Sequence, residues 1–194
     1  MYKNWDDLIK ECENCYKCPL GHTRTNIVIG RGNREASLMF VGEGPGEQED
    51  LKGEPFVGPA GKLLDLLLDA LMFDKNDYYI ANIVKCRPPG NRVPTDEEAE
   101  ACLNYLRNQV YLIKPKIIVC LGATAMKYII DRNAKITQVR GQWVERKNCW
   151  LMPTFHPAAL LRDESKKVLM WDDLKKVKLK FDEINNPELS DNKK

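Results

Sequence analysis

Residues 37–61 read SLMFVGEGPGEQEDLKGEPFVGPAG, and this stretch decides the fold. It begins with an apolar run, Leu38 to Val41, which has the length and composition of a buried strand. The run stops at the segment Gly42-Glu43-Gly44-Pro45-Gly46, because proline and closely spaced glycines continue neither a strand nor a helix. Open α/β sheets bind their ligands where a strand ends in such a turn, at the carboxyl edge.

The turn carries an unusual density of acidic side chains. Four carboxylates lie on it or just beyond it: Glu43, Glu47, Glu49 and Asp50. A dinucleotide site would need Gly-x-Gly-x-x-Gly opening into a helix, and a carboxylate there would repel the phosphate. No Walker-type Gly-Lys-Ser/Thr is present either. The turn therefore predicts a neutral ligand faced by a carboxylate, with a solvated acidic turn as the simpler alternative.

Strand and helix patterns alternate along the rest of the chain. Further apolar runs predict strands over 78–84, 116–121 and 150–155, and residues 25–31 predict an edge strand or extended segment. Helical patterns cover 4–11, 61–73, 94–113, 123–131 and 171–181; the second is apolar on nearly every side, and the third opens with a Thr95–Glu98 capping box. We expect one α/β domain over residues 1–184, with helices on both faces of a parallel sheet and a polar tail from 185 to 194.

Chemically distinctive residues follow the ends of these strands. Glu43, the loop 85–93, Gly122 and His156 each stand at or just after such an end, and Asn82 is close by. The carboxyl ends of parallel strands share one edge of a sheet, so these residues are expected to converge there. The sequence therefore predicts an active site at that edge.

The composition is ordinary for a globular protein, with 43% hydrophobic and 30% charged residues. The formal net charge of +2 creates no strong field, so a DNA partner would have to meet a local basic patch. No apolar run approaches the ~20 residues of a membrane span, and the N-terminus does not read as a signal peptide. We expect a cytoplasmic protein, in which seven cysteines indicate metal or reactive thiols before disulfides.

Four of the cysteines are candidate metal ligands. Cys15 and Cys18 form a C-x-x-C pair, and Cys86 and Cys102 are widely spaced partners. Four sulfur ligands suit zinc or an iron–sulfur cluster, and the single tight pair favours the cluster over a zinc ribbon. The remaining cysteines are an alternative ligand, Cys12, and two thiols expected in ordinary buried positions, Cys120 and Cys149.

The motifs GEGPGEQED, GEPFVGPAG, NIVKCRPPGNRVPT, IIVCLGA and TFHPAALLR occur in this order, together with the four cysteines. From about Cys15 to Arg162 the chain resembles the family 4 uracil-DNA glycosylases. The resemblance implies a three-layer α/β/α sandwich with a short, mainly parallel four-stranded sheet, a structural 4Fe-4S cluster and no catalytic metal. It implies excision of uracil flipped out of DNA, with hydrolysis of the N-glycosidic bond and an abasic site as product. A related branch that traps uracil covalently carries a basic insertion where this chain has PPGNRVP, so the turnover enzyme is implied.

The resemblance also assigns roles within the site. It places Asn82 on the uracil edge, Phe56 against the base, His156 on uracil O2, Glu43 on the attacking water, and the backbone of Gly42 and Gly44 beside the base. For each of these side chains a purely structural role is the alternative. A buried asparagine is usually a paired structural amide, a phenylalanine is usually core, and a lone histidine is usually a satisfied structural residue.

Further residues are expected to shape the pocket or contact DNA. The resemblance suggests that Glu49 or Asp50 excludes the thymine methyl group. The expected DNA contacts are a wedge at Leu160 or Leu161, a phosphate contact at Arg162, and added positive charge from Arg87, Arg92 and Arg140. For any one of these arginines a plain surface charge is the alternative.

Two other function classes compete with the glycosylase. One is a metal-dependent nuclease or phosphohydrolase, with Glu43, Glu47, Glu49 and Asp50 holding Mg²⁺. The other is a non-catalytic iron–sulfur module that binds DNA and releases no base. For the glycosylase we expect single- or double-stranded uracil-containing DNA as partner, a monomer and no membrane contact. The tail offers no convincing motif for a sliding clamp.

Overall fold

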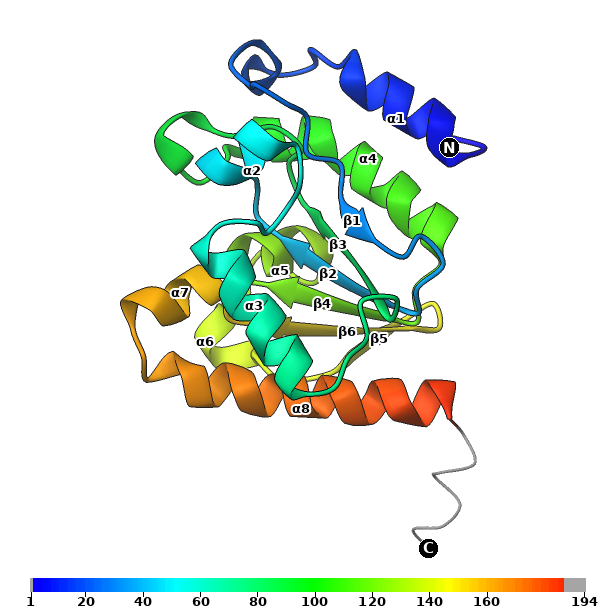
Figure 1. Ribbon diagram of the computed structural model, residues 1–194, viewed down its shortest axis with the longest axis vertical. Coiled ribbons are helices and arrows are strands. Elements are labelled where there is room, and N and C mark those ends of the chain that lie inside the picture. The colour runs from blue at the N-terminus through cyan, green and yellow to red at the C-terminus, as the bar shows by residue number, and fades with distance from the viewer. Residues whose placement is uncertain (1, 187–194) are drawn as a thin grey trace, which may run out of the picture.

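The computed structural model describes residues 2–186 (Figure 1). Its strands are β1 (Arg31–Gly32), β2 (Leu38–Gly42), β3 (Tyr78–Asn82), β4 (Ile117–Leu121), β5 (Val144–Arg146) and β6 (Cys149–Thr154). Its helices are α1 (Trp5–Glu13), α2 (Glu47–Lys52), α3 (Pro59–Ala70), α4 (Asp96–Ile113), α5 (Ala123–Ile129), α6 (Ile136–Val139), α7 (Pro157–Arg162) and α8 (Lys166–Asn185), with short 3₁₀ turns at Pro19–His22 and Pro89–Asn91. None of these helices is long and apolar enough to cross a membrane.

The sheet has six strands in the order β1-β3-β2-β4-β6-β5. The four inner strands are the expected ones and run parallel, whereas β1 and β5 pair antiparallel at the two edges. The prediction of a four-stranded sheet was therefore wrong. Strand β1 has only two residues, so most of the expected extended segment 25–31 forms no strand. Strand β5 is joined to β6 by two residues, Lys147 and Asn148, both at positive φ, as a tight hairpin requires.

Successive side chains of the inner strands enter two different cores. Met39 and Val41 of β2 pack on the side of α1 and α4, while Leu38 and Phe40 pack on the side of α3 and α8. This alternation follows from the twofold repeat of a strand, and because both faces are covered the inner strands read as continuous apolar runs. The result is the expected arrangement of helices on both faces of the sheet (Figure 1).

Several helices differ from the sequence expectation. Helix α3 is only partly buried: Leu64 and Leu68 are in the core, but Leu66 is 66% exposed. Helices α2, α6 and α7 were not predicted, and the residues of the expected wedge and phosphate contact, 160–162, lie within α7. The expected polar tail overlaps the end of α8 at Asn185, and residues 187–194 lie outside the described part of the chain.

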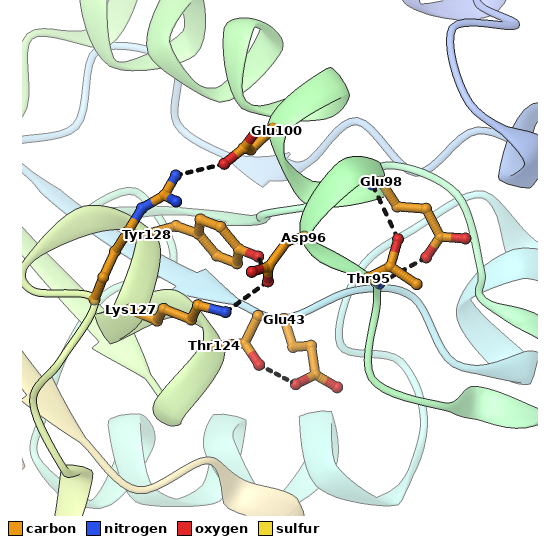
Figure 2. A network of polar contacts seen from close by, with 9 residues as sticks. Glu43, Thr95, Asp96, Glu98, Glu100, Thr124, Lys127 and Tyr128 are labelled. Carbon is orange, nitrogen blue, oxygen red and sulfur yellow. Dashed lines mark hydrogen bonds and ion pairs between the residues drawn. The ribbon is translucent and has the colours of Figure 1, made fainter.

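The capping box of α4 is confirmed. The Thr95 hydroxyl accepts from the backbone N–H of Glu98 at 3.2 Å, and the Glu98 carboxylate accepts from the Thr95 N–H at 2.8 Å (Figure 2). Helix α4 carries Cys102 and packs against the sheet, so this cap fixes the start of a helix that holds one of the candidate metal ligands.

We predict that Thr95→Ala lowers the free energy of unfolding by about 1 kcal/mol, because one N-terminal N–H of α4 loses its acceptor. In a chain of this size that corresponds to about 2–4 °C in the midpoint of thermal unfolding. Thr95→Ser keeps the acceptor and should unfold within a degree of the parent protein. An unchanged midpoint for Thr95→Ala would show that this cap does not stabilise the helix.

Candidate active site

A cavity lies at the carboxyl edge of the sheet, where the ends of β2, β4 and β6 meet. Four of the six residues expected to contact uracil line it: Glu43, Gly44, Phe56 and His156. Gly42 and Asn82 adjoin Phe56, since a Cβ added to Gly42 would fall 2.5 Å from Asn82 Oδ1 and 2.7 Å from Phe56 Cζ. Only glycine fits at position 42, and the strand ends bring these residues together.

The side chain of Asn82 is buried and its oxygen is unpaired. Asn82 is 2% exposed at the last position of β3, directly opposite Gly42 in β2. Its Oδ1 atom has no hydrogen-bond partner among the described residues. Leaving a buried acceptor unsatisfied costs about 1–3 kcal/mol, and native proteins rarely accept that cost without a use for the atom. The structure therefore gives no support to the alternative of a paired structural amide.

The ring of Phe56 is held beside His156 by an unusual backbone. Phe56 is 6% exposed and has a φ of 56°, a conformation that costs a bulky residue free energy. Its ring centroid lies 5.5 Å from that of His156, with 30° between the planes. A Cβ at Gly61 would collide with the Phe56 carbonyl at 1.8 Å, so the helix that follows packs directly on this turn.

Glu49 joins the glycine-rich turn to the Phe56 segment. Its carboxylate accepts from the backbone N–H of Gly46 at 3.1 Å, of Val57 at 3.0 Å and of Gly58 at 2.8 Å. Glu49 also lines the cavity, whereas Asp50 does not. Asp50 is 3% exposed and accepts from the N–H of Thr25 at 2.9 Å. Of the two expected pocket-shaping residues, only Glu49 is placed at the cavity.

Glu43 is oriented by a residue that the sequence analysis missed. The hydroxyl of Thr124, in the first turn of α5, donates to the Glu43 carboxylate (Figure 2). The first turn of α4 anchors α5, because the Asp96 carboxylate accepts from Lys127 and Tyr128, each at 2.5 Å. The only feature of the sequence that could have pointed to Thr124 is its position two residues after Gly122, at the carboxyl end of a predicted strand.

His156 is fixed in one tautomer by its own helix. Its Nδ1 accepts from the backbone N–H of Ala158 at 3.1 Å, so the proton of the neutral ring is on Nε2. Burial lowers the pKa of His156 to about 4, and nearby Arg162 acts in the same direction while Glu49 opposes it. At neutral pH the ring is therefore an uncharged N–H donor. A Cβ at Gly122 would fall 2.9 Å from His156 Cβ, so the β4 turn packs against it closely.

The acidic residues of the turn do not converge on one point. Glu43 pairs with Thr124, Glu49 with three backbone N–H groups, and Asp50 with Thr25. Within residues 2–186 no three His, Cys, Asp or Glu side chains are placed to hold one metal ion between them. The geometry gives no positive support to the Mg²⁺-dependent nuclease.

The four predicted cysteine ligands, Cys15, Cys18, Cys86 and Cys102, line one small pocket, which shares no lining residue with the cavity. Two of their sulfurs accept hydrogen bonds: Cys86 Sγ from the Arg24 guanidinium at 3.4 Å, and Cys102 Sγ from the backbone N–H of Lys85 at 3.3 Å. Cys12 and Cys120 are fully buried in the apolar core and do not line the pocket, and Cys149 is half-buried.

Comparison of the sequence with known proteins places the chain in a family. The profile of the Uracil DNA glycosylase superfamily matches residues 29–175. The chain is 47% identical over 172 residues to the type-4 uracil-DNA glycosylase of Thermotoga maritima, covering 86% of this chain and 88% of the relative. It is 45% identical over 180 residues to that of Archaeoglobus fulgidus, with 89% and 90% covered. The chain belongs to the type-4 uracil-DNA glycosylases.

The side chains expected to meet DNA in this type-4 uracil-DNA glycosylase differ in their availability. Leu160 is fully buried in the core, so it cannot be the wedge, whereas Leu161 is 52% exposed. Arg162 is exposed at the rim of the cavity. Arg140 forms two hydrogen bonds to the buried Asp173 and is 19% exposed, so an internal ion pair replaces the expected DNA contact.

The two remaining arginines already have acidic partners, and of the two only Arg92 lines the cavity. Arg92 makes a two-pronged contact with Glu98, at 2.7 and 2.8 Å. Arg87 lies 3.4 Å from Glu47 and donates to Asn91 at 2.7 Å. Since Arg92 is partly exposed and the Arg87 pair is loose, both retain some capacity to face phosphate.

We predict that the ring protons of His156 keep the chemical shifts of neutral imidazole until the pH falls below about 5, since its pKa is lowered to about 4. The chain has two histidines, so an NMR titration of His22→Gln observes His156 alone. Between the ordinary pKa of 6.5 and about 4 only the unfolded chain gains this proton, so the free energy of unfolding falls as the pH drops through that window. A titration midpoint at 6.5 or higher would contradict the neutral donor.

Proposed function

We propose that this protein flips uracil out of DNA and hydrolyses its N-glycosidic bond, releasing free uracil and leaving an abasic site. One observation carries the proposal: the unpaired, buried oxygen of Asn82 lies beside Phe56, which lines the same cavity as His156 and Glu43. Such a site suits a flat, uncharged base, and flipping is how enzymes reach a base that is stacked in DNA. Family membership supports the same activity.

Asn82 reads the hydrogen-bonding edge of the base. Uracil presents N3–H as a donor, which the free Oδ1 accepts, and O4 as an acceptor, which the amide NH₂ satisfies. Cytosine presents an acceptor at N3 and a donor at N4, so both contacts would be mismatched. Because a buried polar group left unpaired is costly, this reversal alone separates uracil from cytosine strongly. Phe56 completes the recognition by stacking on the ring.

His156 and Glu43 act on the two halves of the breaking bond. As C1′–N1 breaks, its electron pair leaves with uracil, and the Nε2–H of His156 donates to O2, where negative charge develops. Water adds to C1′, and Glu43 orients that water and offsets the positive charge on the sugar. The water's proton is lost to solvent or to Glu43, and uracil N1 is protonated after release.

Leu161 and Arg162 contact the DNA and stabilise it while the uracil is flipped out. Leu161 is an exposed apolar side chain that adjoins Arg162 at the rim of the cavity, so it fills the space that the base leaves in the stack. Arg162, at the rim, contacts a phosphate, with Arg87 and Arg92 adding weaker positive charge. The substrate is uracil-containing DNA, single- or double-stranded, and the acting unit is a monomer of one domain over residues 1–184.

The four cysteines of the pocket hold a 4Fe-4S cluster with a structural role. Their fit rests on the donor set: four thiols line one pocket, and two of the sulfurs accept N–H hydrogen bonds, as cluster ligands do. When bound, the cluster supplies four metal–thiolate bonds that join the segment after α1 to the end of β3 and to α4. Cys15 and Cys18 come from the first of these, Cys86 and Cys102 from the others.

The direct test is release of free uracil from an oligonucleotide with a single uracil, in the presence of EDTA. We expect free uracil and an alkali-labile site on both single strands and duplexes, because no step uses a dissociable metal ion. Strand cleavage that requires Mg²⁺ would favour the nuclease instead. Binding without base release would favour the non-catalytic module.

We predict that Asn82→Ala lowers kcat/KM for uracil at least about 100-fold, since the base loses its one buried acceptor. Asn108→Ala is the matched control: Asn108 is equally buried, but both its amide atoms bond to protein, Oδ1 to the Tyr2 N–H and the NH₂ to Asn104. It should retain the parent rate, and both variants should retain iron. A rate for Asn82→Ala within a few-fold of the parent would remove Asn82 from base recognition.

We predict that Leu161→Ala lowers activity on duplex DNA roughly tenfold more than activity on single strands, because only a duplex needs the vacated stack to be filled. Leu179→Ala, a change at an exposed leucine of α8, is the control and should affect neither substrate. Equal losses on both substrates would show that Leu161 contributes general binding and not a wedge.

A further inference from the structure

Lys85 lies between the cysteine pocket and Asn82. It precedes Cys86, its backbone N–H donates to Cys102 Sγ, and it lines the same pocket as the cysteines. The residue is 1% exposed. Its Nζ donates to the backbone carbonyl of Asn82 at 2.7 Å and to Gln109 Oε1 at 2.6 Å. The ammonium group thus connects the metal-binding pocket to the strand end that carries the base-reading amide.

No ion pair is found for Lys85 within residues 2–186, and both of its acceptors are neutral. A buried ammonium is costly unless an anion accompanies it. The other lysine of the pocket shows the contrast: the side chain of Lys17 is 50% exposed and lies 3.1 Å from the carboxylate of Glu11. Lys85 therefore lacks a counter-ion on the protein side, and the pocket it lines is the remaining place for one.

Gln109 holds the Lys85 ammonium group in this position. It is fully buried in α4, and its NH₂ group donates to the Ile29 carbonyl at 2.9 Å and to the Tyr79 hydroxyl at 3.3 Å. With the amide fixed in this way, its oxygen faces Lys85. The Lys85 side chain is therefore held at the end of β3 and is almost fully shielded from solvent.

We propose that Lys85 supplies the counter-charge of the cysteine-bound cluster and, through the Asn82 carbonyl, positions the residue that reads uracil. This inference rests on the proposed cluster. Four thiolates carry more negative charge than the iron–sulfide core offsets, so the bound unit is anionic and attracts the ammonium. Beyond Asn82 the chain pairs with the catalytic turn, since Ile83 N–H donates to Gly42 at 2.9 Å and Val84 N–H to Glu43 at 3.1 Å.

Two substitutions separate charge from hydrogen bonding. Lys85→Met removes both, whereas Lys85→Gln removes the charge and keeps a donor for the Asn82 carbonyl. Lys17→Met is the matched control, because it removes an exposed and already paired ammonium from the same pocket. Each full-length protein is purified anaerobically and measured for iron per chain, rate of bleaching with an iron chelator, midpoint potential, and kcat and KM per cluster-loaded molecule.

We expect both Lys85 variants to bleach at least fivefold faster than the parent and to show a more negative midpoint potential, since a cation near the cluster favours its reduction. Among loaded molecules, kcat falls more in Lys85→Met than in Lys85→Gln, and Lys17→Met matches the parent throughout. Parent-like bleaching and potential in Lys85→Gln would overturn the proposal, even if Lys85→Met does not fold. A parent protein without iron and sulfide would instead refute the cluster, and one that releases no uracil would refute the proposed function.

Discussion

The side-chain oxygen of Asn82 is an acceptor that the protein buries and leaves unpaired, and the arrangement of the site follows from that constraint. The oxygen can stay unpaired only if the strand around it is rigid, so that no donor of the protein reaches it. Parallel pairing of β3 with β2 supplies that rigidity and sets Asn82 opposite Gly42. Glycine at position 42 then leaves room for Phe56 to approach the amide.

The other side chains of the site are also held in place by hydrogen bonds to neighbouring groups. A backbone N–H of α7 donates to the Nδ1 of His156, which leaves a neutral Nε2–H donor at the cavity. Thr124 orients Glu43, and Glu49 fastens the two glycine-rich segments to each other. In His156 and Glu43, hydrogen bonds within the protein fix the orientation and leave another atom available for the substrate. Such preorganisation reduces the reorganisation needed when charge develops on the base.

The sequence predicted the convergence of Glu43, Asn82 and His156 because parallel strands must end at a common edge, and each residue stands at or near such an end. It also predicted the capping box at Thr95, which is a local pattern. It could not predict the Arg140–Asp173 pair or the pairing of Asp50 with Thr25, since both join segments that only the tertiary fold brings together. Strand β5 was missed because it is three residues long, mostly polar, and defined by its partner. Leu160 and Leu161 are adjacent in sequence, and only helix α7 sends one to the core and leaves the other exposed.

The most direct measurement of the central claim is a crystal structure of the protein with free uracil bound. The account requires uracil N3 to lie within hydrogen-bonding distance of Asn82 Oδ1, uracil O2 to face Nε2 of His156, and the ring to stack on Phe56. Uracil bound elsewhere, or an Asn82 oxygen that pairs with another protein group while the base occupies the cavity, would contradict it.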